Sequence, residues 1–132
     1  MTLSEINVLV GESDWAWAEA VECIFAPRGV NSIVAADAAS TLDIIERRNI
    51  HTAIVDMDSV PASGLSIIRL IRGYYPMLPC ILLSRSVEEK LLARALALDV
   101  FSVIAKPVDM VILQDQLNRL FMKKYNSAVF NS

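Results

Sequence analysis

The chain has 132 residues, a length typical of one domain, and 55% of them are hydrophobic. Its net charge of −3 at pH 7 argues against direct binding to nucleic acid, because recognition of the phosphate backbone needs a basic surface. Charged or turn residues interrupt each apolar run before the roughly 20 residues of a membrane span, and the N-terminus lacks a signal-peptide pattern, so we expect a cytoplasmic protein without membrane contact.

Short apolar strand patterns alternate with helical patterns along the whole chain. Because right-handed crossovers place helices on both faces of a parallel sheet, this alternation predicts an α/β fold with a doubly wound sheet of five strands. We expect the third strand to be central, since its short run of Thr, Ala, Ile and Val is typical of a strand buried on both faces. The second strand is more polar at its start and is expected to lie nearer an edge. The strands are predicted at 6–10, 31–35, 51–56, 79–84 and 101–105, and the helices at 15–26, 37–49, 65–72, 86–98 and 109–125.

The fourth predicted helix carries two further signals. Ser86 has the capping-box spacing to Glu89, which predicts that the fourth helix begins there. The leucines of that helix cover more than one face, so some of them are predicted to be exposed as a contact surface for a partner or a second copy. Residues 126–132 after the last helix are predicted to form a frayed tail, with docking of Val129 and Phe130 as the alternative.

The groups that follow four of the five predicted strands suit phosphate chemistry. The carboxyl ends of parallel strands lie along one rim of the sheet, so these groups are expected to meet. Crowded carboxylates repel one another, and a hard cation such as Mg²⁺ relieves that repulsion. A carboxylate can also attack phosphorus, while a lysine offsets charge on the phosphate oxygens and a hydroxyl donates to them. The groups are Glu12, Ser13 and Asp14 after the first strand, Asp56 and Asp58 at the third, Ser84 at the fourth and Lys106 at the fifth.

This ordered set resembles the receiver domain of two-component response regulators, over about residues 5–124. The resemblance depends on the acidic turn after the first strand, on Asp56 followed by Gly64 eight residues later, on Ser84, and on a Lys-Pro pair that begins at Lys106. It implies a flavodoxin-like three-layer sandwich with strand order 2-1-3-4-5, forming a single receiver domain over the 132 residues.

The resemblance also implies a role for each strand-end residue. Asp56 would be the phosphoacceptor, Ser84 the switch hydroxyl, and Lys106 the lysine that contacts the phosphoryl group. The bond between Lys106 and Pro107 would be cis, which would aim the lysine. The implied Mg²⁺ ligands are Glu12, Asp56 and the backbone carbonyl of Asp58, with Ser13 or Asp14 as further candidates.

The chain departs from the family pattern at three positions, one of which is Pro61, a proline that stands one place later than usual in the loop after Asp56. Receivers usually carry two adjacent acids after the first strand, whereas this chain has Glu12 and Ser13, so we expect weakened Mg²⁺ binding unless Asp14 compensates. Val103 stands where receivers usually have an aromatic residue whose rotamer follows phosphorylation. We therefore expect the coupling between phosphorylation and the output face to be missing or to follow another route.

The expected function is that of a response regulator receiver in a phosphorelay rather than an enzyme. Asp56 would accept a phosphoryl group from a histidine kinase or phosphotransfer protein. The face built by 86–98, 101–105 and 109–125 would then contact a downstream protein or a second copy. The alternative is a degenerate receiver that is not phosphorylated and serves as a constitutive interaction or dimerisation module. A flavin-binding protein would need a phosphate loop less acidic than residues 11–15.

Overall fold

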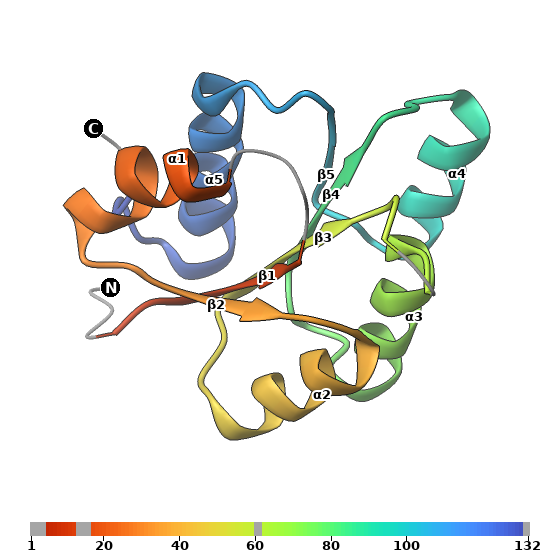
Figure 1. Ribbon diagram of the computed structural model, residues 1–132, viewed down its shortest axis with the longest axis horizontal. Helices are drawn as coiled ribbons and strands as arrows, with labels where there is room; N and C mark the ends of the chain where they lie inside the picture. Colours follow the sequence, from red (N-terminus) through yellow and green to blue (C-terminus); the bar gives the residue numbers. More distant parts are fainter. Residues whose placement is uncertain (1–4, 13–16, 60–61, 131–132) are drawn as a thin grey trace.

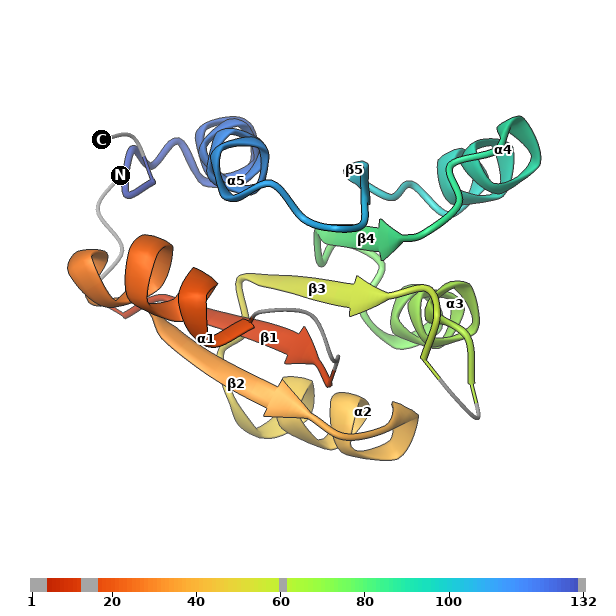
Figure 2. The same cartoon turned by 45° about the horizontal axis from the view of Figure 1, so that its top comes forward.

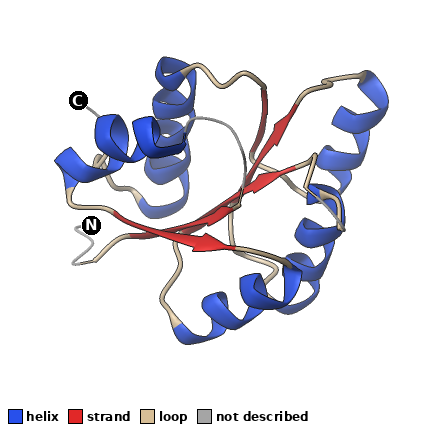
Figure 3. Cartoon of the chain, in the orientation of Figure 1, coloured by secondary structure: helices blue, strands red, loops and turns tan. Residues whose placement is uncertain are grey.

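The fold is a five-stranded parallel sheet covered by helices on both faces (Figures 1 and 3). The computed structural model describes residues 5–12, 17–59 and 62–130. The strand order is β2-β1-β3-β4-β5, which confirms the predicted doubly wound topology, with β3 in the centre and β2 at an edge. The strands are β1 (Asn7–Gly11), β2 (Asn31–Ala35), β3 (Thr52–Asp56), β4 (Cys80–Ser84) and β5 (Ser102–Ala105).

The helices lie in two layers. In Figure 1, α1 and α5 cover one face of the sheet, and α2, α3 and α4 cover the other. Within the described part of the chain, no helix combines the length and hydrophobicity needed to cross a bilayer. The helices are α1 (Trp17–Ala20), followed by a π-helical turn (Val21–Phe25) and a 3₁₀ turn (Ala26–Arg28), then α2 (Ala38–Arg47), α3 (Gly64–Tyr74), α4 (Glu89–Ala97) and α5 (Met110–Tyr125).

Each face of the sheet has its own apolar core. Alternate side chains of a strand point to opposite faces, so Val8 and Val10 pack toward α1 and α5 while Leu9 packs toward α2 and α3. The central strand β3 is buried along its full length. Burial on both faces explains why the inner strands β1, β3 and β4 are mainly apolar in sequence.

Two predicted helix ends differ from the structure. The first helix does not stop at Ala26, because Pro27 is accepted at the start of the 3₁₀ turn and the chain ends this turn at Gly29, whose φ is 66°. The predicted capping box at Ser86 is wrong: α4 begins at Glu89, and Glu88 precedes it without a side-chain capping bond. The main-chain groups of Ser86 are bonded to Ser84 instead.

The C-terminal segment is docked rather than frayed, as far as Phe130. Phe130 is 1% exposed, and its ring centroid lies 4.8 Å from that of Phe121. The hydroxyl of Tyr125 donates to the carbonyl of His51 at the start of β3. The described part of the tail therefore completes the core under α5, which corrects the prediction of a frayed end.

The buried His51 makes stability depend on pH. Burial lowers the pKa of His51, and its Nδ1 accepts the main-chain N–H of Asn7 at 3.2 Å, which requires the neutral ring. The unfolded chain takes up the proton first as the pH falls, so this contribution to stability is present above about pH 6.5 and is lost as the pH falls through the lowered folded value. We expect the free energy of unfolding to decline between about pH 7 and pH 5, and the decline to be smaller in His51→Gln.

Urea unfolding of both proteins at several pH values measures this difference. An identical pH dependence in wild type and His51→Gln would contradict the assignment.

Candidate functional site

Three strand ends bring charged groups together on one rim of the sheet. The arrows of β1, β2, β3 and β4 point the same way in Figure 2, so their carboxyl ends share this rim. The Nζ of Lys106, just after β5, lies 2.9 and 3.0 Å from the two carboxylate oxygens of Asp56 at the end of β3. Residues 50 positions apart in sequence thus form a direct ion pair.

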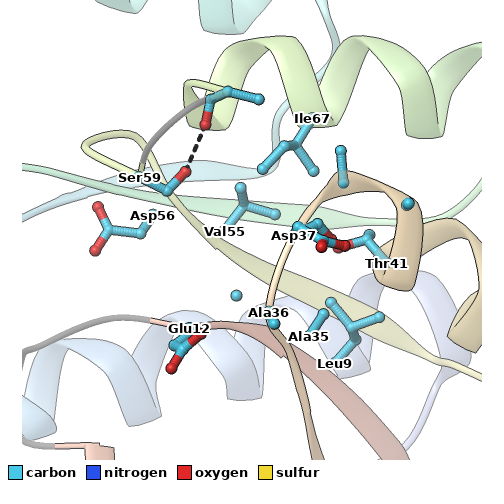
Figure 4. A pocket seen from close by; sticks show the side chains of 14 residues that line it. Leu9, Glu12, Ala35, Ala36, Asp37, Thr41, Val55, Asp56, Ser59 and Ile67 are labelled. Carbon is cyan, nitrogen blue, oxygen red and sulfur yellow. Dashed lines mark hydrogen bonds between the residues drawn. The ribbon is translucent and has the colours of Figure 1, made fainter.

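The carboxylate of Asp56 is held in a fixed orientation. Its Oδ1 accepts the main-chain N–H of Asp58 at 2.8 Å in addition to the bond from Lys106. Asp56 is only 4% exposed, yet it lines a cavity of about 210 Å³ between β1, β3 and the start of α2. Figure 4 shows Asp56 and Glu12 toward one end of this cavity. Asp56 is thus a buried residue at the edge of a cavity.

Lys106 is the cation of this site. Its Nζ lies 2.9 Å from Oδ2 of Asp58 as well as contacting both oxygens of Asp56. Burial alone lowers the pKa of Lys106, but hydrogen bonds and charge from Asp56 and Asp58 outweigh burial, so the pKa is raised above its usual value. The ammonium group stays charged, and the bond between Lys106 and Pro107 is cis, as the resemblance implies.

Ser84 lies on the same rim but faces the β4–α4 loop. Its hydroxyl donates to the carbonyl of Ser86 at 2.6 Å and accepts the main-chain N–H of Ser86 at 3.3 Å. Arg85 lies between these two serines, and its main-chain N–H donates to Oδ2 of Asp58 at 3.1 Å. The hydroxyl is thus close to the rim, and it must rotate before it can contact a group on Asp56.

The metal ligands implied by the resemblance are only partly assembled. Glu12 is exposed and lines the cavity that Asp56 also lines, whereas Ser13 and Asp14 lie outside the described residues. Within the described part of the chain, no three His, Cys, Asp or Glu side chains are grouped to hold a metal ion. Because Mg²⁺ keeps several waters and can be held by one or two carboxylates plus a phosphate, the described residues fit a weak site.

Sequence reasoning missed the role of the Asp58 side chain. The resemblance implied only its backbone carbonyl, but its carboxylate contacts both Lys106 and the N–H of Arg85. The sequence places this carboxylate two residues after Asp56, but it does not show which way the side chain points, so it carried no signal for the contact. Asp58 remains 32% exposed in its side chain, so it lies at the mouth of the site.

Gly64 allows α3 to begin against the end of β3. A Cβ on Gly64 would lie 2.6 Å from the carbonyl oxygen of Asp56, a distance that requires the backbone to shift. Its N–H donates to the carbonyl of Met57 at 3.1 Å. This close approach explains why a glycine stands eight residues after Asp56.

Two alanine substitutions in α3 separate the clash at Gly64 from helix propensity. We expect Gly64→Ala to lower the free energy of unfolding by about 2 kcal/mol, because the added methyl group meets backbone. Gly73→Ala is the matched control: no atom lies within 4 Å of a Cβ there, so it should be neutral or stabilise by about 0.5 kcal/mol. Urea denaturation measures both, and equal effects would contradict the close approach.

Known proteins with similar sequences are response regulators. The chain is 23% identical over 107 residues to an NtrX-like response regulator of Rickettsia felis, and 25% identical over 107 residues to one of Rickettsia bellii. Each match covers 80% of this chain and 22% of the relative, so the chain spans about a fifth of the length of these curated relatives.

Solved structures share the fold over most of the chain. A response regulator receiver protein from Pseudomonas putida has a TM-score of 0.78 and 26% identity, over 89% of this chain and 99% of that one. The signal receiver domain of an HD domain-containing protein from Pseudomonas fluorescens Pf-5 has a TM-score of 0.81 and 20% identity, over 93% and 99%. The family model for the response regulator receiver domain matches residues 8–118. With its strand order and the pairing of Asp56 with Lys106, the chain belongs to the response regulator receiver domain family of two-component systems.

Proposed function

We propose that this receiver domain is phosphorylated on Asp56 and passes the signal on through a protein-interaction face. The observation that carries the proposal is the direct pairing of the carboxylate of Asp56 with Nζ of Lys106, at 2.9 and 3.0 Å. A carboxylate in this setting can act as a nucleophile, and the ammonium offsets the charge that the phosphoryl oxygens bring. A histidine kinase or phosphotransfer protein is the proposed donor.

The transfer step needs few groups from the protein. An oxygen of Asp56 forms a bond to phosphorus as the bond from phosphorus to the donor's leaving atom breaks, and the leaving group departs with that electron pair. Lys106 holds the transferred oxygens, and Ser84 donates to one of them after its hydroxyl turns from Ser86. Glu12 and Asp56 would hold Mg²⁺, with the carbonyl of Asp58. When bound, Mg²⁺ supplies further neutralisation of phosphoryl charge.

The proposed output surface is the face formed by α4, β5 and α5. Leu92 and Leu96 on α4 are 42% and 78% exposed, which bears out the prediction that part of this leucine-rich helix faces outward. Val111 and Ile112 on α5 are also exposed, at 77% and 50%. An apolar surface of this kind suits a protein partner or a second copy of the chain.

Incubation with acetyl phosphate and Mg²⁺ tests the phosphorylation. We expect the intact mass to rise by one phosphoryl group per chain, and the modification to decay on removal of the donor. A folded protein that stays unmodified at high donor concentration would contradict the proposal.

A second candidate is the constitutive interaction module. Two observations favour it: Val103, partly buried on β5, replaces the family's aromatic residue, and Lys106 is already shared by two carboxylates. Mg²⁺ titration separates the candidates, and the fluorescence of Trp17, which packs against the core between the sheet and α5, is the readout. A response at millimolar Mg²⁺ supports the phosphorylated receiver, and silence together with an unchanged mass supports the module.

A further inference from the structure

We propose that the carboxylate of Asp58 is an internal anion that competes with the phosphoryl group for its donors and so restrains phosphorylation of Asp56. The proposal rests on the proposed function, since it concerns how readily Asp56 accepts the group. It assigns to the side chain of Asp58 a role distinct from that of its backbone carbonyl. The contacts that support the proposal join Asp58 to Lys106 and to Arg85, and all three residues belong to the part of the chain that the structure describes.

The donors around Asp58 are already fully engaged. An ammonium group has three N–H donors, and Nζ of Lys106 has three carboxylate oxygens within 3.0 Å: both from Asp56 and Oδ2 from Asp58. The main-chain N–H of Arg85 also donates to Oδ2 of Asp58, at 3.1 Å. One carboxylate oxygen of Asp58 therefore accepts from a side chain after β5 and from the main chain after β4.

A phosphoryl group on Asp56 would need the same donors. Lys106 contacts both oxygens of Asp56, so phosphoryl oxygens attached to either one would lie within reach of Nζ. Esterification removes the negative charge of Asp56, so the charged acceptors that then compete for Nζ of Lys106 are the phosphoryl oxygens and Oδ2 of Asp58. Two anions cannot share this small site without repulsion, since the ammonium supplies a single positive charge. The phosphoryl group carries the larger negative charge, and it therefore displaces the carboxylate of Asp58 from Lys106.

Displacement of Asp58 would also change the β4–α4 loop. The contact from Asp58 to the N–H of Arg85 ties this loop to the end of β3. Its loss frees the segment that leads into α4, whose leucines form part of the proposed output surface. Asp58 thus offers a route from the site to that surface in a chain where Val103 replaces the usual aromatic residue.

Rates of phosphorylation by acetyl phosphate in the full chain test the competition. Asp58→Asn keeps an oxygen that can accept the N–H of Arg85 and removes the charge, so we expect the initial rate to rise about tenfold over wild type. Asp115→Asn, which removes an exposed carboxylate on α5, is the charge-matched control and should leave the rate unchanged. Asp58→Ala should also speed amide exchange at Arg85 about tenfold, whereas Asp58→Asn should not.

The outcomes separate this inference from the proposed function. A wild type that gains phosphate and an Asp58→Asn variant that gains it no faster would overturn the competition and leave the function standing. A wild type that stays unmodified while Asp58→Asn is modified would support the competition and would contradict the proposed function, because the natural chain would then not accept the group. If neither gains phosphate, the proposed function is contradicted and the restraint by Asp58 with it.

Discussion

Asp56→Asn is expected to abolish phosphate uptake from acetyl phosphate while the protein remains folded. An amide of the same shape keeps an oxygen that can accept from Lys106 and from the N–H of Asp58, but its carbonyl oxygen is a poor nucleophile. The loss should exceed about 100-fold in the rate of modification, measured by intact mass over time.

The control for this substitution is Asp115→Asn, which removes the same charge from the exposed surface of α5. It should be modified like wild type. Phosphate uptake that persists in Asp56→Asn, with circular dichroism unchanged, would show that another residue accepts the group.

Lys106→Met should both destabilise the fold and slow phosphorylation. The side chains of Lys106 and Asp56 are 7% and 5% exposed, so removing the cation leaves a buried carboxylate without its main counter-charge. Loss of one partner of a buried pair costs about 3 kcal/mol, and we expect the free energy of unfolding at pH 7 to fall by that amount. Phosphoryl oxygens would lose their cationic contact in the same variant.

Urea unfolding and the rate of phosphate uptake measure the two effects in parallel. Lys124→Met is the matched control, because Lys124 is exposed in the last turn of α5 and forms no ion pair with the residues that the structure describes. Its stability should change by less than about 0.5 kcal/mol. Equal stability of Lys106→Met and wild type would show that the pair contributes nothing to folding.

The sequence was sufficient to predict the sheet, because its signal is repeated along the chain. Each buried strand is a short apolar run, and each run is followed by a helical pattern, so small errors at the ends do not alter the topology. The helix ends were harder to predict. At Ser86 the local capping pattern was outweighed by bonds to Ser84, an interaction created by the turn after β4.

The site was predictable to the extent that it depends on strand ends. Asp56 and Lys106 could be placed on one rim, since parallel strands end together. The contact between Asp58 and Lys106 could not, because it depends on the direction of a side chain in the turn after β3. The docking of Phe130 was missed for a similar reason: a single aromatic residue near the chain end carries no periodic signal.

Chemical localisation of the phosphoryl group tests the central claim most directly. After modification with acetyl phosphate, borohydride reduces an aspartyl phosphate, and trypsin cleavage after Arg48 and Arg69 releases residues 49–69 as one peptide. Fragmentation of this peptide distinguishes Asp56 from Asp58. We expect the reduced residue at position 56 alone; a reduced residue at position 58, or elsewhere in the chain, would contradict the role of Asp56 as the phosphoacceptor.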